Sequence, residues 1–257
     1  MFVAGIDIGS VTTKGVLYDG KSYKTIYQPT GFDPATIGDT VIQELQSQYK
    51  VSAHEILGIY GTGYGRIHLP QADEIFSEIT CQGRGCNYLF PGVGGILDVG
   101  GQDSKAMRIN QEGKVKEFVL NDKCAAGTGR FLEMSLNALG ITLKQIDDIA
   151  DQDHPVDIGS MCSVFCETEV LNLLMQGEDK GKIVAGLLKS IATRVAAMIK
   201  KVSKSDEIVF TGGISQSLVM RHFLAEMSGF KVHTPENPVV TAALGAAILG
   251  YEKRVKQ

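Results

Sequence analysis

Two short stretches of the chain combine a cysteine with the start of a helical segment. One is NDKCAAGTGRFLE, from Asn121 to Glu133, and the other is GSMCSVFCETE, from Gly159 to Glu169. Cys124 and Cys162 each precede a segment with helical periodicity, where backbone N–H groups without helical partners and the helix dipole stabilise a thiolate. Because the thiolate is the form of cysteine that binds metal, both residues are candidate metal ligands.

The first of these stretches also has the composition of a phosphate site. Gly127, Thr128 and Gly129 lie at the expected helix start, where N–H groups and the dipole favour an anion. One short stretch could therefore contact both a metal centre and a nucleotide. Cys166 comes four residues after Cys162, so a packed thiol is expected there, with a ligand role in a non-dimeric site as the alternative. Cys81 and Cys86, five residues apart, are expected to pack in the interior.

Composition and charge narrow the class of protein. A chain of 257 residues with 44% hydrophobic residues can bury a large core as one domain or two similar lobes. The net charge of −4, without a basic block, argues against nucleic acid as a partner. The five cysteines do not form a secreted disulfide pattern, and the first residues lack the basic region of a signal peptide. The cysteine pattern and these first residues place the protein in the cytoplasm. Charged residues interrupt the apolar segment from 182 to 202, so no membrane span is expected there.

The elements that position these residues follow from periodicity and turn residues. A β-hairpin is expected from Phe2 to Gly20, with Gly9 to Lys14 at its tip. Apolar spacing predicts a core helix from Lys182 to Val202. The remaining expected elements are a helix from Asp33 to Tyr49, a strand from Ile56 to Tyr60, a helix from Asp73 to Leu89, strands from Glu207 to Phe210 and near Lys231 to Thr234, and a terminal helix containing Ala242 to Ala247.

An internal repeat is the most informative pattern in the sequence. DIGSVTTK, from Asp7 to Lys14, aligns with DVGGQDSK, from Asp98 to Lys105: an apolar strand, then Asp, a glycine two residues later, Ser or Thr, and Lys seven residues after the Asp. The repeat predicts two lobes of similar design. An aspartate ending each inner strand could hold hydrated Mg²⁺, while glycine amides and hydroxyls bind phosphates between the lobes. The turn from Phe210 to Ser215 could pass close to a nucleotide, and the sequence has no P-loop motif.

These motifs carry a resemblance to a known family. The two hairpins, the Thr-Gly-Gly turn and the Ala-Leu-Gly-Ala-Ala helix resemble the actin, hexokinase and acetate-kinase superfamily. Within it, IDIGS, TGYGR, LDVGGQDSK, NDKCAAGTGRFLE, SMCSVFCE and TGGIS resemble the activators of 2-hydroxyacyl-CoA dehydratases and the related benzoyl-CoA reductase ATPase subunits. The resemblance covers nearly the whole chain, with the motifs in order.

The resemblance implies an α/β fold of two ribonuclease H-like lobes with nucleotide in the cleft. Residues 1–92, completed by the C-terminal helix at about 240–257, would form the first lobe, and residues 93–239, with the cluster-ligand helices, the second. A homodimer would hold one 4Fe-4S cluster, with Cys124 and Cys162 of each subunit as ligands. Because such a cluster needs four thiolates, two from each subunit complete the set.

The repeat, the chemistry of the side chains and the resemblance together assign the nucleotide site. Asp7 and Asp98 would act on Mg²⁺ or phosphate, and Gln102 would orient the attacking water or contact a phosphate. For TGYGR, a role in binding nucleotide or partner and a structural turn both remain open. The implied phosphate contacts are Ser10, Val11, Thr12, Thr13, Lys14, Gln102, Gly127, Thr128 and Gly129, and the implied adenosine contacts are Gly212 and Gly213.

The function expected from these residues is ATP-dependent one-electron transfer. ATP hydrolysis would drive low-potential transfer from the cluster to a partner iron-sulfur enzyme, a 2-hydroxyacyl-CoA dehydratase or a double-cubane cluster protein, with ferredoxin or flavodoxin as donor. The alternatives are a small-molecule kinase on the same fold, and a nucleotide-dependent scaffold with structural zinc between subunits.

Overall fold

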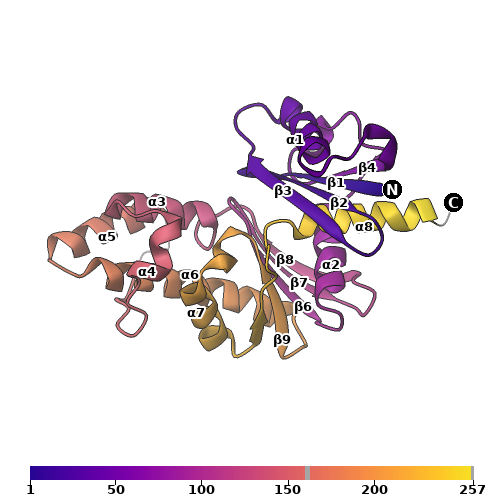
Figure 1. Cartoon of the computed structure of the whole chain (residues 1–257). Coiled ribbons are helices and arrows are strands. Elements are labelled where there is room, and N and C mark those ends of the chain that lie inside the picture. Colours follow the sequence, from indigo (N-terminus) through magenta and orange to yellow (C-terminus); the bar gives the residue numbers. More distant parts are fainter. Residues whose placement is uncertain (160–162, 256–257) are drawn as a thin grey trace. The chain divides into compact units, whose positions relative to one another are not determined.

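A computed structural model describes residues 1–159 and 163–255 of the chain and divides it into two compact units (Figure 1). The first unit comprises residues 1–92, 109–116 and 239–257, and the second comprises residues 93–108 and 117–238. Each unit contains a five-stranded mixed sheet. The hairpin tip of the second sheet, within residues 109–116, is assigned to the first unit. This is the α/β architecture that the sequence predicts.

The first sheet has the order β3-β2-β1-β4-β5. Its strands are β1 (Phe2–Ile8), β2 (Thr12–Tyr18), β3 (Tyr23–Pro29), β4 (Ile56–Thr62) and β5 (Glu74–Ile75). The strands β1, β2 and β3 run antiparallel, and β4 runs parallel to both β1 and β5. Helix α1 (Pro34–Tyr49) covers one face through Val41 and Leu45, and helix α8 (Thr241–Val255) covers the other through Ala243 and Ala247 (Figure 1).

Helix α2 (Glu78–Leu89) packs against α8 at backbone distance because glycines lie at the contact. A Cβ atom on Gly245 would lie 1.8 Å from the carbonyl oxygen of Cys81, and one on Gly85 would lie 2.1 Å from that of Thr241. The buried hydroxyl of Thr241 also donates to Oε1 of Gln82 at 3.0 Å. No larger residue fits at either glycine without moving a helix.

The helix predicted from Asp73 to Leu89 begins later in the structure, because α2 starts at Glu78. Residues 74–75 form β5 instead, and α2 begins after Ser77, whose hydroxyl accepts a hydrogen bond from the Thr80 N–H. The carboxylate of Asp73 accepts the Ile59 N–H at 2.8 Å and pairs with Arg254 at 2.7 Å. These contacts link residues distant in sequence, so helical periodicity alone did not reveal them.

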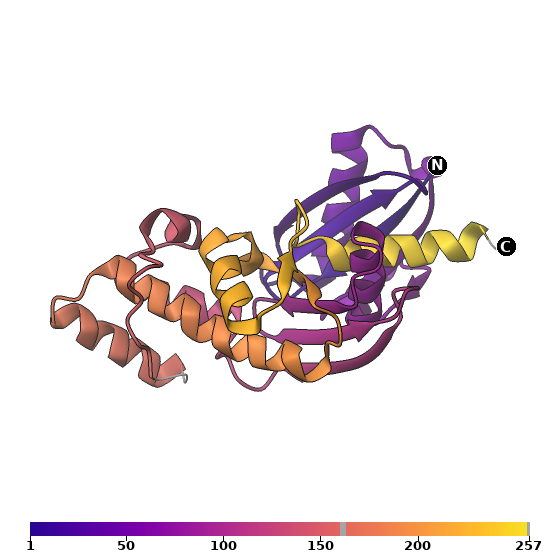
Figure 2. The same cartoon turned by 90° about the horizontal axis from the view of Figure 1, so that it is seen from below.

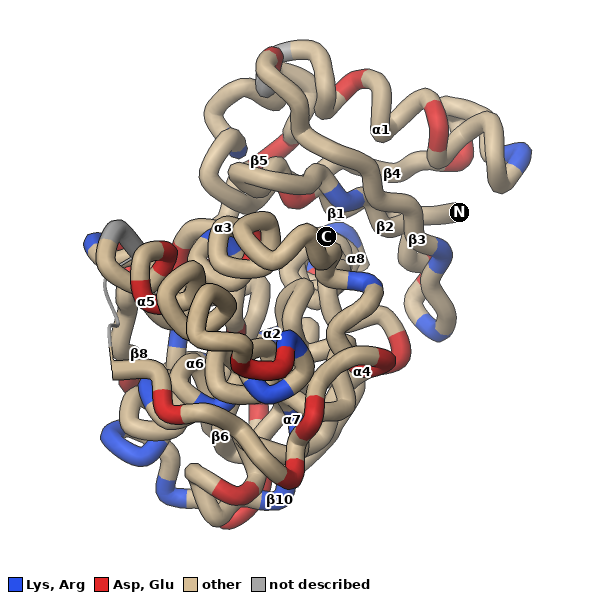
Figure 3. Tube along the Cα trace, turned by 90° about the vertical axis from the view of Figure 1, so that its left-hand side faces the viewer, with Lys and Arg blue, Asp and Glu red and all other residues tan. Residues whose placement is uncertain are grey.

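The cationic end of α8 is more than a solvated helix terminus. Lys253 pairs with Glu74 and Arg254 with Asp73, while Glu252 pairs with Arg84 of α2. Each exposed pair contributes at most about 1 kcal/mol. Figure 3 shows Lys and Arg interspersed with Asp and Glu along the chain trace.

The second sheet has the order β10-β9-β6-β7-β8. Its strands are β6 (Gly95–Val99), β7 (Ser104–Ile109), β8 (Val115–Asn121), β9 (Glu207–Thr211) and β10 (Lys231–His233). The helices of this unit are α3 (Gly129–Leu139), α4 (Ile146–Ile149), α5 (Ser163–Met175), α6 (Lys180–Val202) and α7 (Leu218–Ser228), seen from below in Figure 2. The sequence predicts α6 and β9 to within two residues.

The long helix α6 forms the centre of the second core. Its predicted apolar stripe is buried, with Ile183, Leu187, Ile191 and Val195 all inaccessible to solvent beside Phe131 of α3 and Phe210 of β9. Short 3-10 helices occur at Ala53–Glu55, Arg66–His68, Leu143–Gln145 and Gly213–Gln216. Among the helices of residues 1–159 and 163–255, none is both long enough and apolar enough to cross a membrane.

Candidate functional site

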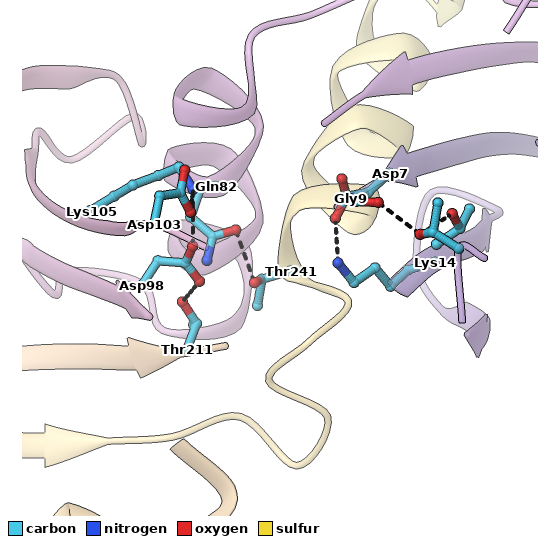
Figure 4. Close-up of polar contacts among 11 residues, drawn as sticks. Asp7, Gly9, Lys14, Gln82, Asp98, Asp103, Lys105, Thr211 and Thr241 are labelled. Atoms are coloured by element: carbon cyan, nitrogen blue, oxygen red, sulfur yellow. Dashed lines mark hydrogen bonds and ion pairs between the residues drawn. The ribbon is translucent and has the colours of Figure 1, made fainter. Parts of the chain in front are cut away.

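The sequence repeat becomes a structural repeat of an ion pair across each inner hairpin. In the β1–β2 register Asp7 lies opposite Lys14, and in the β6–β7 register Asp98 lies opposite Lys105. Lys14 Nζ lies 3.1 Å from Asp7 Oδ2, and Lys105 Nζ lies 3.7 Å from Asp98 Oδ2 (Figure 4). The turns of the two hairpins have equal length. The same seven-residue spacing therefore places a lysine ammonium group beside the aspartate carboxylate near the end of each inner strand.

Asp7 retains an oxygen suited to a cation. Its Oδ1 atom is buried and has no hydrogen-bond partner within the described residues. Gly63, which directly follows β4 and has a φ of +89°, lies next to that atom, and a Cβ there would come within 2.2 Å of it. An unpaired buried carboxylate oxygen is costly, and Mg²⁺ prefers such oxygen ligands. The sequence left both a ligand-binding role and a structural turn open for TGYGR, and its glycine leaves space beside a candidate Mg²⁺ ligand.

The tip of the first hairpin combines exposed residues with an ordered support. Ser10 and Val11 are exposed, whereas Thr13 is buried and its hydroxyl lies 2.9 Å from that of Thr30. Thr30 in turn donates to the carbonyl oxygen of Gly9 at 2.7 Å, and the Gly9 N–H donates to the carbonyl of Thr12 at 3.1 Å. These bonds hold the tip in one conformation, as a phosphate-binding turn requires.

Asp98 differs from Asp7 in its hydrogen bonding. Asp98 Oδ1 accepts the hydroxyl of Thr211 at 2.7 Å, and its Lys105 partner also contacts Asp103 at 2.7 Å (Figure 4). Gln102, in the following turn, is exposed. Donors from Thr211 and Lys105 therefore hold the Asp98 carboxylate in one orientation. Asp7, in contrast, keeps one carboxylate oxygen without a hydrogen bond within the described residues.

The turn that carries Cys124 is built by side chains of its own segment. Asn121 ends β8 and donates from its amide to the carbonyl oxygens of Cys124 at 3.0 Å and Ala126 at 2.9 Å. The Thr128 hydroxyl and N–H both donate to the carbonyl of Ala125, at 2.6 and 3.0 Å. The Cys124 thiol remains exposed on this ordered turn.

The first turn of α3 is hydrogen-bonded to the turn that follows Asp98. The Gly129 N–H donates to the carbonyl of Gly100 at 2.9 Å, and the Arg130 N–H donates to that of Gly101 at 2.8 Å. Ser104 of β7 donates to the carbonyl of Gly127 at 2.5 Å. A phosphate bound by the Gly129 N–H would have to replace the Gly100 carbonyl as acceptor. The two predicted phosphate segments of this unit therefore contact each other directly.

The third predicted turn is also rigid. Gly212 has a φ of +90°, and a Cβ there would lie 2.0 Å from the Val99 carbonyl oxygen, so only glycine fits. Gly213 is exposed, with open space where a Cβ would lie. Asp147 caps the start of α7 by accepting from Ser217 and Leu218 at 2.5 and 2.8 Å. Of the described residues from 210 to 215, only Gly213 is exposed, so a ligand could contact this turn there.

The described cysteines differ in their exposure to solvent. Cys124 is exposed, whereas Cys81, Cys86 and Cys166 are buried, and Cys162 lies outside the described residues. Burial raises the pKa of Cys81 to about 12 and also raises the pKa of Cys166, whose sulfur lies 3.7 Å from the Ser135 hydroxyl. Burial and protonation at neutral pH make both thiols unsuitable ligands. Within residues 1–159 and 163–255, no group of three or more potential metal ligands occurs, so Cys124 fits a cluster only together with thiolates from outside that set.

Thiol reactivity tests this difference. In native apoprotein at pH 7.5, iodoacetamide should modify Cys124 at least about 100-fold faster than Cys81 or Cys166, since both buried thiols are protonated and shielded. Mass spectrometry of peptides from timed samples would give the three rates, and alkylation in denaturant serves as the control. Equal native rates would contradict the burial described for α2 and α5.

Comparison with known proteins identifies the family. The model of the BadF/BadG/BcrA/BcrD ATPase family matches residues 4–250, nearly the full length of the chain. The chain belongs to this ATPase family. It is 35% identical over 261 residues to the activator of lactoyl-CoA dehydratase of Anaerotignum propionicum, covering 100% of both chains.

Solved structures of family members have the same fold. The Clostridium difficile activator of 2-hydroxyisocaproyl-CoA dehydratase, in a structure with bound ADPNP, is 32% identical and matches with a TM-score of 0.92, over 100% of this chain and 96% of the other. Component A of the (R)-2-hydroxyglutaryl-CoA dehydratase of Acidaminococcus fermentans is also 32% identical, with a TM-score of 0.94 and 99% coverage of both chains. The resemblance inferred from the sequence motifs and the actin-like ATPase fold are both confirmed.

Proposed function

We propose that this protein is an activator of an iron-sulfur enzyme, in which ATP hydrolysis drives one-electron transfer at low potential. The observation that carries the proposal is the contact between the Gly100–Gly101 turn, which follows Asp98, and the start of α3, which follows Cys124. A segment that responds to nucleotide would thus be hydrogen-bonded to a segment that holds an exposed thiol. The relatives named as dehydratase activators support the choice of partner class.

The nucleotide would be bound as MgATP. Asp7 would take Mg²⁺ or its hydration shell through Oδ1, while Asp98 and Gln102 would position phosphate or the attacking water. Glycine turns and side-chain hydroxyls would bind the phosphates and the adenosine. We assign the phosphates to Ser10, Val11, Thr12, Thr13, Lys14, Gln102, Gly127, Thr128 and Gly129, and adenosine to Gly212 and Gly213. The relative with bound ADPNP supports the nucleotide class.

The metal centre would be one 4Fe-4S cluster held by a homodimer. Cys124 and Cys162 would ligate it in each subunit, because a cluster needs four thiolates and Cys81 and Cys166 are buried and protonated. The cluster would supply one-electron redox chemistry, with ferredoxin or flavodoxin as donor. The acceptor would be a 2-hydroxyacyl-CoA dehydratase or a double-cubane cluster protein.

Purification without oxygen, followed by assays of iron, sulfide and ATP hydrolysis, tests this function. We expect about four irons per dimer, with loss of iron in Cys124→Ala and Cys162→Ala. Cys166→Ala is the matched control and should retain iron, because its thiol packs between α5 and α3. ATP hydrolysis should need no small acceptor. An iron-free wild-type protein whose ATP turnover required a small-molecule acceptor would instead establish the kinase alternative.

A further inference from the structure

Asn121 belongs to neither the proposed nucleotide site nor the proposed set of cluster ligands. It is the last residue of β8, directly before the exposed residues Asp122 and Lys123 and three residues before Cys124. Both hydrogen bonds recorded for its amide nitrogen go to main-chain carbonyls of the same turn, those of Cys124 and Ala126. Because an amide nitrogen has two N–H donors, this geometry uses the full donor capacity of the group.

We propose that Asn121 is a positioning residue for Cys124. Its amide joins the two carbonyls that flank Ala125, so the turn cannot open without breaking both bonds. The Ala126 carbonyl directly precedes Gly127, whose own carbonyl is held by the buried hydroxyl of Ser104 at 2.5 Å. Asn121 therefore fixes the position of the exposed thiol relative to the first turn of α3.

The chemistry of the site explains why an amide is needed. An aspartate has nearly the same shape but offers only acceptors when ionised, so its carboxylate would face two carbonyl oxygens. The turn would have to open to relieve that repulsion. Serine and threonine carry a single donor and could hold only one of the two carbonyls. The requirement at position 121 is thus for two donors on a short side chain.

The experiment compares wild-type protein with Asn121→Asp and a charge-matched control, Asn110→Asp. Asn110 lies at the other end of the β7–β8 hairpin, and its Oδ1 accepts the Lys114 N–H, a bond that aspartate keeps. Its amide donates to the exposed Glu112 carboxylate, so the control also loses an amide donor, but within a turn distant in sequence from Cys124. The first measurement is the alkylation rate of Cys124 by iodoacetamide in the apoprotein. We expect a change of about fivefold or more in Asn121→Asp, because two hydrogen bonds hold the turn, and no change in Asn110→Asp.

A local effect is distinguished from general loosening by the buried Cys166. Its thiol packs against Ser135 of α3, so its alkylation rate reports whether the α3–α5 packing has opened. It should stay slow in Asn121→Asp. A rise in the alkylation rate of Cys166 in Asn121→Asp, parallel to that of Cys124, would overturn the positioning role. An alkylation rate of Cys124 equal to that of the wild type would also overturn it. If Asn121→Asp does not fold, Asn121→Ala removes the same bonds without adding charge.

The second measurement uses the protein after anaerobic purification and rests on the proposed function. The electron paramagnetic resonance spectrum of the reduced cluster should change in Asn121→Asp and stay unchanged in Asn110→Asp, because ligand orientation affects the cluster. An unchanged spectrum in Asn121→Asp would overturn the role toward the cluster. Wild-type protein without iron would defeat the proposed function instead, and the alkylation rates would still decide whether Asn121 positions Cys124.

Discussion

Substitution of Asp7 by asparagine is expected to lower the rate of Mg²⁺-dependent ATP hydrolysis by about 100-fold or more, which corresponds to roughly 2.7 kcal/mol in activation free energy. Asparagine preserves the size of the side chain but removes its negative charge. Within the part of the chain that the structure describes, the Oδ1 atom of Asp7 is buried beside Gly63 without a hydrogen-bond partner, so the proposed cation loses its carboxylate there. Steady-state rates over a range of Mg²⁺ concentrations would measure the effect.

Asp19→Asn is a suitable control because it makes the same change near the far end of β2. The Asp19 carboxylate accepts the N–H groups of Lys21 and Ser22 at 2.8 and 2.7 Å, and these bonds lower its pKa to about 2. Its role is confined to that turn, so ATP hydrolysis should stay within about twofold of wild type. Wild-type hydrolysis by a folded Asp7→Asn variant would remove Asp7 from the catalytic set and leave Asp98 as the candidate Mg²⁺ carboxylate.

Substitution of Gly245 by alanine should destabilise the first unit by about 3 kcal/mol, at the upper end of the usual cost of overpacking. The new Cβ would lie 1.8 Å from the Cys81 carbonyl oxygen and 2.5 Å from its carbon, so α2 and α8 would have to separate. For a chain of this length, the loss corresponds to a fall in Tm on the order of 10 °C. Differential scanning calorimetry would measure it.

The comparison variant is Gly213→Ala, where the added Cβ meets no atom within 4 Å and φ lies outside the left-handed region. Its Tm should stay within about 2 °C of wild type, because no contact changes. Equal Tm values for the two variants would mean that the α2–α8 contact is wider than the structure gives.

Local patterns predicted much of the fold. The Asp-to-Lys spacing of each hairpin depends only on strand alternation and turn length, so the Asp7–Lys14 and Asp98–Lys105 pairs follow from the repeat. The stripe of α6 follows from helical period and burial, because one face of a core helix must be apolar. Both features are properties of short segments, which explains why they can be inferred without tertiary contacts.

Features that depend on contacts distant in sequence were missed or incomplete. β3 has no pronounced apolar alternation and was not predicted. Pairing of β5 with β4 displaced the start of α2 to Glu78. The composition of NDKCAAGTG suggested phosphate binding, but not that the Gly129 N–H would already donate to Gly100. The roles assigned to Gln102, Gly213 and Cys162 remain predictions.

The dependence of the first unit on α8 has a consequence during synthesis on the ribosome. Strands β1 to β4 are complete by residue 62, yet the helix covering one face of their sheet begins at residue 241. At a synthesis rate of about 5–20 residues per second, that face of the sheet stays uncovered for roughly 10–35 s, until α8 has been made. Val16 and Tyr18, buried in the finished protein, are then exposed on the nascent chain. This interval is when we expect binding by a holdase chaperone to matter most for the yield of folded protein.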